Sequence, residues 1–425
     1  MLDLTLSPSQ QAAVNMVQDW YQDWCNNPSQ ARQEFRLFGY AGTGKTTIIK
    51  EVIKQLDRPR TVYMAFTGKA ASVMTQNGLP ARTIHSTIYH PRLPSKEEVL
   101  KLQAELDAAV AREDKEEAAR LKQVLFSANK VEYRLRDPDE CDLAKAKLAV
   151  LDECSMVNTE LARDLLSYGT PVLVIGDPGQ LPPIDGTCKL VNGVPDITLT
   201  EIHRQAEQSP IISFATKARN GQPIALTDPD ALGGTGLILP NDDRLNSYLL
   251  EYDQVLCGTH KTRRAVNRWY RSEKGYNDIF PEPGERIICM KNDHSRGLLN
   301  GETFIVHERV QEMANYIEYR LAPDTNPDDP YEDVIPVHRG HFLSYLDPKA
   351  SRPIDIPHWE LHDGAAFDFA YAITVHKAQG SQWNNVVFYD DGFLRWNRED
   401  RRKLVYTAIT RAADKLVIVS SFNAR

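Results

Sequence analysis

The sequence predicts an α/β protein built on two parallel-sheet cores. Short aliphatic or β-branched stretches alternate with helical runs, which is typical of strands buried on both faces of a parallel sheet. One set of stretches spans 35–38, 61–66, 147–151 and 171–175, and a second set spans 254–257, 369–373, 385–389 and 416–419. At 425 residues the chain exceeds what a single core usually accommodates, so two or more domains are expected.

The composition is that of an ordinary globular protein, with 42% hydrophobic residues. No stretch is long and apolar enough to span a bilayer, and the N-terminus lacks the basic segment of a secretory signal. The six cysteines show no C-x-x-C spacing, which favours reduced cytoplasmic thiols over disulfides or a zinc site. The net charge of −8 gives no sign of nucleic acid, so such a partner would need a local basic groove.

Residues 39–46 read G-Y-A-G-T-G-K-T between an apolar stretch and a helical run at 47–56, which is the pattern of a phosphate-binding P-loop. The glycines let backbone N–H groups surround the phosphates, and the helix N-terminus adds partial positive charge. Lys45 would neutralise phosphate oxygens and Thr46 would place its hydroxyl on Mg²⁺. The sequence therefore predicts binding of ATP or GTP. The predicted nucleotide-binding residues of the loop are Gly39, Gly42, Thr43, Gly44, Lys45, Thr46 and Thr47.

Two further segments follow apolar strands. Asp152 is placed to hold Mg²⁺, and Glu153 to orient and deprotonate an attacking water. An acidic pair commonly just caps the next helix, but its position after a P-loop and a buried strand favours catalysis. The segment 176–183 places Gln180 on a loop stiffened by prolines, where the alternative is a simple tight turn.

Two insertions interrupt the alternation of strands and helices. The stretch 95–126 is rich in Ala, Glu, Lys and Leu, and it predicts a helix or a helical hairpin, or simply a solvated surface helix. Its apolar positions at helical spacing are Leu102, Leu106, Val110, Ala118, Leu121 and Leu125. Between 285 and 362, alternating segments and the hairpin signal Asn300-Gly301 predict a small β-barrel module.

Six segments, in this order, resemble the motifs of superfamily 1 helicases. They are G-Y-A-G-T-G-K-T at 39–46, L-D-E-C-S-M at 151–156, G-D-P-G-Q-L-P-P-I at 176–184, E-I-H-R-Q at 201–205, T-V-H-K-A-Q-G-S-Q at 374–382 and V-Y-T-A-I-T-R-A at 405–412. The last two are most similar to the RecD and Dda branch, which includes phage enzymes. The resemblance runs from Leu6 to Val419.

The resemblance implies two RecA-like domains, with a helical insertion in the first and an SH3-like β-barrel insertion in the second. The implied first domain comprises 1–92 and 135–205 around the insertion 93–134, and the second comprises 206–284 and 363–425 around the insertion 285–362.

The resemblance also assigns roles to single residues. Gln10 would read adenine, Gln180 would sense the γ-phosphate, and Arg204 and Arg411 would act as arginine fingers across the cleft between the domains. Together with Lys45 and Glu153, the last three form the implied catalytic set. Gln382 would lie near the ribose where many relatives carry glutamate, and Tyr40 stands where related loops often have proline. Nucleotides other than ATP therefore remain open.

Short polar residues after core strands can donate to phosphates without reading sequence. The candidates for contact with one DNA strand are Thr67, Lys69, Thr83, His85, Thr259, Lys261, Thr374 and His376. Together they resemble the family's track across both domains. Lys261, Arg263, Arg264 and Arg268 also predict a basic helix face, which could equally be solvated charge. Binding should be nearly independent of sequence and weakened by salt.

The resemblance implies an ATP-dependent DNA helicase that uses Mg²⁺, moves 5′ to 3′ on single-stranded DNA and unwinds duplex at single-strand/duplex junctions. Two alternatives stay open: a nucleic-acid-stimulated ATPase that remodels protein–DNA complexes without unwinding, and a P-loop kinase or switch. We expect a monomer without membrane association in the cytoplasm of a bacterium or of a phage-infected host. Replication or recombination proteins are candidate partners.

Overall fold

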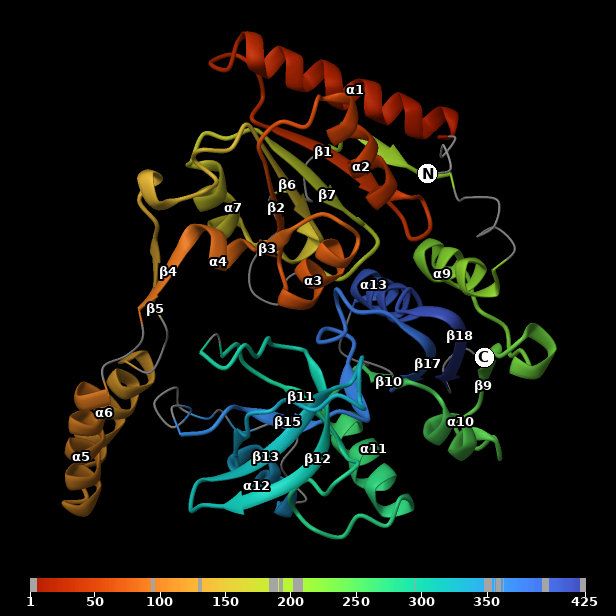
Figure 1. Ribbon diagram of the computed structural model, residues 1–425. Helices are drawn as coiled ribbons and strands as arrows, with labels where there is room; N and C mark the ends of the chain where they lie inside the picture. Colours follow the sequence, from red (N-terminus) through yellow and green to blue (C-terminus); the bar gives the residue numbers. More distant parts are fainter. Residues whose placement is uncertain are drawn as a thin grey trace. The chain divides into compact units, whose positions relative to one another are not determined.

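The computed structural model describes residues 6–92, 96–128, 132–182, 190, 194–201, 209–293, 295–347, 354, 356, 361, 363–391 and 397–420. The chain forms two compact units, which Figure 1 traces along the sequence. The first unit comprises Met1–Ile88, Asp137–Tyr270 and Tyr371–Arg425, and the second comprises Tyr89–Arg136 and Arg271–Ala370. The division into four domains made from the sequence stays a prediction.

The first unit contains a six-stranded parallel sheet in the order β3-β2-β6-β7-β1-β8. Its strands are β1 (Glu34–Gly39), β2 (Thr61–Ala65), β3 (Ala81–Thr83), β6 (Leu148–Asp152), β7 (Val172–Gly176) and β8 (Ile197–Leu199). The central strands β6 and β7 are apolar and almost wholly buried, as expected of a parallel sheet covered on both faces. The four strands predicted in this region are confirmed with small shifts at their ends.

Helices pack against this sheet, and two of them determine the position of the P-loop. They are α1 (Pro8–Asn26), α2 (Lys45–Gln55), α3 (Gly68–Gln76), α4 (Ile84–Ile88) and α7 (Thr159–Leu166), with short 3-10 turns at Pro138–Glu140 and Cys154–Met156. Helices α1 and α2 share one apolar core, in which Val14 and Val17 of α1 lie with Ile48 and Val52 of α2. This packing holds the first turn of α1 beside the loop that precedes α2.

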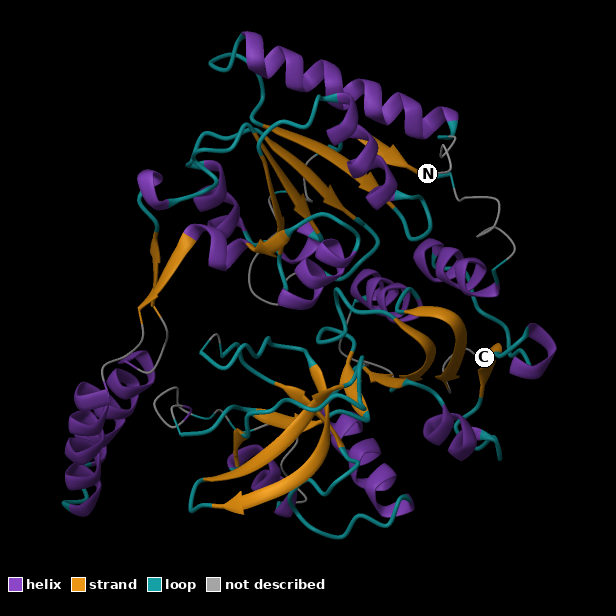
Figure 2. Ribbon diagram, viewed as in Figure 1, coloured by secondary structure: helices purple, strands orange, loops and turns teal. Residues whose placement is uncertain are grey.

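The first unit also contains a second parallel sheet, with five strands in the order β16-β10-β17-β18-β9. Its strands are β9 (Thr235–Ile238), β10 (Gln254–Cys257), β16 (Ala372–Thr374), β17 (Trp383–Asp390) and β18 (Ala412–Ser420). Its helices are α9 (Pro210–Asn220), α10 (Leu245–Glu251), α11 (His260–Glu273) and α13 (Arg398–Ile409), with a 3-10 turn at Pro229–Leu232. The prediction of an α/β protein with two parallel sheets is confirmed (Figure 2).

The strand predicted at 369–373 is wrong. It falls on two strands of different sheets, because β15 (Phe367–Phe369) pairs antiparallel with β11 whereas β16 pairs parallel with β10. A continuous apolar run shows that a segment is buried but does not show that its pairing partner changes within it.

The two parallel sheets repeat one connectivity. Taken in chain order, β1, β2, β3, β6 and β7 occupy the same spatial positions in the first sheet as β9, β10, β16, β17 and β18 occupy in the second. The carboxyl ends of parallel strands meet at one edge of a sheet, where ligand sites of open α/β sheets form. The repeat therefore gives two equivalent edges for functional residues.

The second unit includes the helical insertion. The antiparallel strands β4 (Tyr89–Arg92) and β5 (Glu132–Leu135) flank helices α5 (Lys96–Ala111) and α6 (Lys115–Ala128) in sequence. The two helices pack through Leu106, Ala109, Ala118 and Leu121. Val110, expected on the inner face, is 55% exposed, and its neighbour Ala109 is buried instead. The role of these helices stays a prediction.

The second unit also contains a five-stranded antiparallel sheet in the order β14-β13-β12-β11-β15. Besides β15 it comprises β11 (Arg286–Cys289), β12 (Thr303–Glu312), β13 (Tyr316–Pro323) and β14 (Ile335–His338), followed by α12 (Gly340–Leu343) and a 3-10 turn at Ser344–Leu346. A bridge between Val337 and Ala365 joins β14 to the segment before β15. The two edges of the sheet therefore meet. Its assignment as SH3-like stays a prediction.

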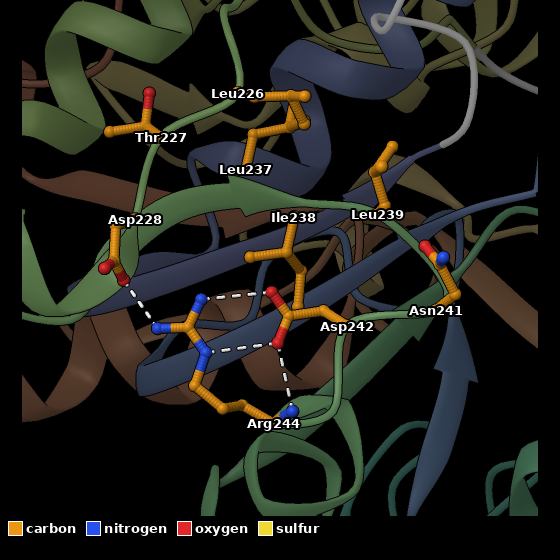
Figure 3. Close-up of a pocket in the computed structure, with 9 residues that line it drawn as sticks. All are labelled: Leu226, Thr227, Asp228, Leu237, Ile238, Leu239, Asn241, Asp242 and Arg244. Carbon is orange, nitrogen blue, oxygen red and sulfur yellow. Dashed lines mark hydrogen bonds and ion pairs between the residues drawn. The ribbon is translucent and has the colours of Figure 1, made fainter.

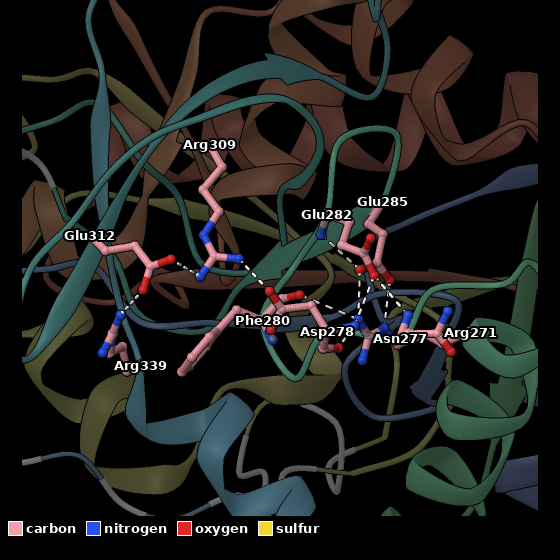
Figure 4. A network of polar contacts seen from close by, with 9 residues as sticks. All are labelled: Arg271, Asn277, Asp278, Phe280, Glu282, Glu285, Arg309, Glu312 and Arg339. Carbon is pink, nitrogen blue, oxygen red and sulfur yellow. Dashed lines mark hydrogen bonds and ion pairs between the residues drawn. The ribbon is translucent and has the colours of Figure 1, made fainter.

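A buried ion pair ties the end of α11 to this antiparallel module (Figure 4). Arg271 Nε and Glu285 Oε1 lie 2.7 Å apart, and the Glu285 side chain has no solvent exposure. The Glu285 carboxylate also accepts a backbone N–H from Glu282 at 2.9 Å, and the Arg271 guanidinium lies 4.2 Å from the ring centroid of Phe369. Each of these buried charges compensates the other, because removing one leaves its partner buried without water or a counter-charge.

The first prediction concerns this pair. Glu285→Ala leaves the Arg271 guanidinium buried without its carboxylate, so the free energy of unfolding should fall by about 3–5 kcal/mol. Glu308→Ala removes an exposed partner of Arg320 in the same sheet and should cost less than about 1 kcal/mol. Urea unfolding of both variants makes the comparison. Equal losses of unfolding free energy in the two variants would mean that the buried pair stabilises the protein no more than the exposed pair does.

Candidate functional site

The P-loop follows β1 directly and opens α2. Gly42 and Gly44 both have φ of 79°, a left-handed conformation that side chains with a Cβ rarely adopt. A Cβ on Gly39 would approach Thr43 Oγ1 to 2.6 Å, so the loop needs glycine there as well. Lys45 Nζ donates to the carbonyl oxygens of Gly39 at 2.8 Å and Tyr40 at 3.2 Å. The lysine thus lies over the loop. In a nucleotide complex, phosphate oxygens would accept its hydrogen bonds in place of the two loop carbonyls.

Two acidic residues stand at the end of β6, and the first of them interacts electrostatically with the P-loop lysine. Asp152 ends the strand, and Glu153 follows with φ of 53°, an uncommon conformation for a residue other than glycine. Burial, and then the charge of Glu153, raise the pKa of Asp152 to about 6, and the charge of Lys45 opposes that rise. A cation near Asp152 would relieve this cost. The arrangement fits Mg²⁺ held by Thr46, one carboxylate, water and phosphate oxygens.

Gln180 lies between the candidate base and the candidate arginine finger. The hydrogen-bond network places its amide nitrogen 3.2 Å from Glu153 Oε2 and its amide oxygen 3.3 Å from Arg411 Nη2. Gln180 and Arg411 are each 6% exposed. The chain Glu153–Gln180–Arg411 therefore runs from the end of β6 in the first sheet to the segment between α13 and β18 of the second. The structure brings together these three residues, which the sequence placed in one site.

Asp177 and Tyr406 complete this contact, and sequence reasoning did not select them. The Tyr406 hydroxyl donates to Asp177 Oδ2 at 2.6 Å and accepts the backbone N–H of Ala41 in the P-loop at 2.9 Å. Burial raises the pKa of Asp177, and the Lys45 charge and the Tyr406 hydrogen bond oppose the rise. In the sequence, the sign that these two residues matter is their position inside the motif segments 176–184 and 405–412.

Three further hydrogen bonds join the same segments. Leu181 N–H donates to Thr407 Oγ1 at 3.0 Å, and Gln379 Nε2 donates to Leu181 O at 3.1 Å. Arg411 Nη1 donates to Ser381 O at 3.2 Å. Buried hydrogen bonds of this kind fix register because an unmade one leaves a polar group without water. The loop after β7 is thereby fixed to both α13 and the segment 379–381.

Tyr40, the departure from related P-loops, has a specific contact. The Arg219 guanidinium, in the last turn of α9, lies 3.6 Å from the centroid of the Tyr40 ring. A cation over an aromatic face is stabilised by the ring quadrupole. The P-loop apex is therefore held by α9 as well as by Tyr406.

Four threonines of the predicted DNA track share one local structure. Each stands at the carboxyl end of a strand, and its hydroxyl accepts the backbone N–H three residues later, at 3.1–3.3 Å. Thr83 and Thr374 are the last residues of β3 and β16, and Thr67 and Thr259 come two residues after β2 and β10. Such capping leaves the first N–H groups of each helical turn directed outward, where they can bind an anion. The equivalent strands of the two sheets thus carry equivalent threonine-capped turns.

The flanking side chains repeat as well. Lys69 and Lys261 stand two residues after their threonines, as do His85 and His376. Burial lowers the pKa of both histidines from 6.5, so they are neutral at pH 7 and can donate a hydrogen bond without a charge. Lys69 lies 4.8 Å from the ring centroid of Trp383.

The basic face predicted on α11 is wrong. Arg263 and Arg264 are 2% and 1% exposed, because this side of α11 packs inward together with Val266 and Asn267. Lys261 is exposed and Arg268 is half-buried. A helix rich in arginine was expected to be solvated. The spacing of its basic residues along the sequence does not show that two of the guanidinium groups are buried.

The remaining predicted residues lie apart from this contact network or outside the described chain. Gln382 is exposed just before β17, and Arg204 lies outside the described residues. Within the described ranges no group of His, Cys, Asp and Glu forms a metal cluster, and no helix there is long and apolar enough to cross a membrane.

A cavity of about 340 Å³ lies beside edge strand β9 (Figure 3). Its walls include Leu226, Ile238 and Arg244, and the Arg244 guanidinium is held by Asp228 and Asp242. None of the predicted site residues lines it.

The fold and the P-loop define a P-loop nucleotide-binding protein. The sequence matches the family model of an AAA domain over residues 28–234 and that of the UvrD-like helicase C-terminal domain over residues 369–419. Over 308 residues it is 27% identical to the ATP-dependent RecD2 DNA helicase of Deinococcus radiodurans, which covers 65% of this chain. The chain spans 37% of the length of that relative.

Solved Pif1 helicases share the fold. One from Bacteroides in complex with ADP-AlF3 and single-stranded DNA is 19% identical with a TM-score of 0.52, over 98% of this chain and 93% of that one. Another from Candida albicans is 17% identical with a TM-score of 0.51, over 99% and 95%. The sequence matches thus make the chain similar to DNA helicases of the RecD group, in agreement with the ordered motifs, and the solved Pif1 structures show that it shares their fold.

The second prediction tests the hydroxyl that joins α13 to the P-loop. Tyr406→Phe keeps the ring but removes the partner of Asp177 Oδ2 and of the Ala41 N–H, so the free energy of unfolding should fall by about 1–3 kcal/mol. Tyr133→Phe, at a tyrosine that is 52% exposed, is the control and should change little. Denaturant titration measures both, and an unchanged Tyr406→Phe protein would refute the contact.

Proposed function

We propose that this chain is an ATP-dependent DNA helicase that moves on single-stranded DNA, 5′ to 3′, and unwinds duplex. The observation that carries the proposal is the chain Glu153–Gln180–Arg411, which connects the P-loop side of one sheet with the other sheet. A nucleotide bound there would be held by groups of both sheets. The similarity to RecD and Pif1 helicases supports DNA as the partner, and polarity rests on that similarity alone.

The proposed chemistry is hydrolysis of ATP by an activated water. Glu153 accepts the proton of the water, while Lys45 and the loop N–H groups stabilise the phosphates. Mg²⁺, held by Thr46 and Asp152, would neutralise charge on the phosphate oxygens. Arg411 and Arg204 stabilise the charge that develops on the transferred group, and Gln180 reports its presence to the DNA track. The remaining proposed nucleotide contacts are Gln10, Gly39, Gly42, Thr43, Gly44, Thr47 and Gln382.

Movement follows from sharing one nucleotide between two sheets. ATP binding favours closure because both sheets contact the phosphates, and hydrolysis removes the contacts that keep the cleft closed. The segment 374–381 includes the DNA-track residue Thr374 as well as Gln379 and Ser381, which bond toward Leu181 and Arg411. Closure would therefore shift one pair of threonine-capped turns relative to the other. A single strand held by both pairs then advances with each cycle.

The alternative is an ATPase that uses the same cycle to remodel protein–DNA complexes without separating strands. It needs the same cleft and track, so it differs only in what happens at a duplex junction. A P-loop kinase or switch is disfavoured because it would not require the second sheet and its arginine.

The third prediction separates binding from chemistry. Lys45→Ala should weaken nucleotide binding and abolish turnover, because the cation that holds the phosphates is lost. Glu153→Gln should bind ATP normally and hydrolyse it very slowly, because only the base is lost. Nucleotide affinity and steady-state hydrolysis are measured for both. Near-normal turnover of Glu153→Gln would rule out its assignment as the base.

The fourth prediction concerns the arginine finger. Arg411→Ala should leave nucleotide binding largely intact and slow single-turnover hydrolysis about 10³-fold or more at saturating DNA. Arg401→Ala, on helix α13 in an ion pair with Asp390, is the matched control and should lose only a few-fold. Similar losses in both variants would mean that Arg411 only helps the sheets pack.

The fifth prediction tests the function itself. The protein with ATP and Mg²⁺ should unwind a partial duplex that carries a 5′ single-stranded tail and leave a 3′-tailed duplex intact. Unwinding of only the 3′-tailed substrate would reverse the polarity. Hydrolysis without unwinding of either substrate would favour the remodelling ATPase.

A further inference from the structure

The carboxylate of Asp391 contacts one of the four threonine-capped turns. Asp391 directly follows β17, and Thr259 comes two residues after the neighbouring strand β10. Asp391 Oδ2 accepts the Thr259 hydroxyl at 2.7 Å and the Thr259 backbone N–H at 3.0 Å. The hydroxyl also lies 3.0 Å from Thr262 Oγ1, but the shorter contact is with the charged acceptor, which is the stronger partner. The hydroxyl and the N–H carry one hydrogen each, so one carboxylate uses both donors of this threonine.

The other three threonine-capped turns differ in this respect. Thr67, Thr83 and Thr374 each accept a backbone N–H through the hydroxyl, as Thr259 does. Among the contacts of the described residues, none of these three hydroxyls meets a carboxylate. The turn at Thr259 is therefore the one that already holds a negative group of the chain itself.

The repeat of the two sheets shows what the position of Asp391 corresponds to. Strand β17 occupies the place of β6, so Asp390 and Asp391 stand in the second sheet where Asp152 and Glu153 stand in the first. In the first sheet the second acidic residue is the candidate base, and it lies 3.2 Å from the Gln180 amide nitrogen. In the second sheet the equivalent residue is bonded to a threonine of the predicted DNA track.

A phosphate and the Asp391 carboxylate cannot accept the same two hydrogens. A phosphate that reaches Thr259 either displaces the carboxylate, which breaks two charge-assisted hydrogen bonds, or binds beside it and meets a like charge at close range. Both routes weaken phosphate binding at this turn. Thr374, whose described contacts include no carboxylate, remains the candidate strand contact of the second sheet.

We infer that Asp391 competes with a phosphate of single-stranded DNA for the Thr259 turn and thereby lowers the affinity of the chain for the strand. This inference rests on the proposed function, because it takes the four turns as the strand track. The Thr259 turn then holds the strand less tightly than the equivalent Thr67 turn of the first sheet. Unequal contacts of this kind would let one sheet release the strand while the other retains it.

The test measures the binding of a fluorescent oligothymidylate to the whole chain by anisotropy, without nucleotide and at several salt concentrations. Asp391→Asn removes the charge with almost no change in size, and Asp391→Ala removes the acceptor as well. Glu273→Gln is the matched control, because it removes the same charge at the exposed opposite end of α11. Urea midpoints show that each variant is folded.

Both Asp391 variants should lower Kd for the strand roughly tenfold at low salt, because a like charge beside the phosphate is removed. The slope of log affinity against log salt concentration should steepen by up to about 0.7, because one further phosphate is contacted. Glu273→Gln should change Kd by less than about twofold, because its exposed charge is distant from the turn and screened by salt.

Two threonine variants show whether the gain depends on Thr259. Thr259→Val keeps the size of the side chain and removes the hydroxyl. It should change Kd by less than about twofold in the parent and weaken binding about fivefold in the Asp391→Asn background, where the hydroxyl is released to the strand. Thr67→Val should already weaken binding in the parent, because its hydroxyl has no such competitor among the described residues.

Strand binding that is unchanged or weaker in both folded Asp391 variants would overturn the inference, because the carboxylate would then only order the turn. A gain in affinity that Thr259→Val does not reduce would overturn it as well. If the parent binds the strand and the Asp391 variants show no gain, only this inference fails. Absence of strand binding in the parent and in every variant would contradict the proposed function together with the inference.

Discussion

The nucleotide site depends on the hydrogen bonds that cross from α13 and the segment after β16 to the P-loop sheet. Tyr406 holds Ala41 and Asp177, Thr407 holds the loop after β7, and Arg411 contacts Gln180. Except for the half-buried Ala41, these groups are buried, so a bond that breaks among them leaves a polar group without water. In the proposed cycle, a change at the phosphates would reach the second sheet through these few bonds.

The two sheets repeat one arrangement of candidate DNA-contact residues, which supports the proposed movement along a single strand. Each sheet presents threonine-capped turns at the ends of two neighbouring strands, with a lysine after one threonine and a histidine after the other. Helix N-termini and neutral histidines bind phosphate through hydrogen bonds that any nucleotide can accept. The proposed stepping along a strand needs two equivalent contact sites whose separation depends on one nucleotide, and the two sets of threonine-capped turns are the candidates. The net charge of −8 does not oppose this, because the donors are local.

Much of the fold was predictable, because strands buried on both faces leave apolar runs and a P-loop has a fixed spacing of glycines. The site was partly predictable: Glu153, Gln180 and Arg411 come from three separate motifs, and the structure brings them together. Sequence patterns gave wrong predictions where the structure depends on which other segment a residue packs against. The run 369–373 changes sheets within five residues, and Arg263 and Arg264 are buried although their helix looks solvated. Asp177 and Tyr406 matter through a contact between motifs, which no single motif reveals.

The same reasoning limits what a resemblance can assign to one residue. The resemblance predicts that Gln10 reads the base, and its amide also contacts the Thr43 carbonyl and the Ser7 N–H of this chain. Tyr40 replaces a proline of related loops and has Arg219 against its ring. Position in a motif predicts the neighbourhood of a residue, whereas its hydrogen bonds determine what it can do there.

The central claim is that the nucleotide cleft and the threonine-capped track are mechanically connected. The most direct measurement is the rate of ATP hydrolysis by the whole chain as the concentration of single-stranded DNA is raised at fixed ATP and Mg²⁺. The account predicts a low basal rate that rises and saturates with the single strand, because strand binding across both sheets favours the closed cleft. A rate that is the same with and without single strands, under conditions where the strand is bound, would contradict the account.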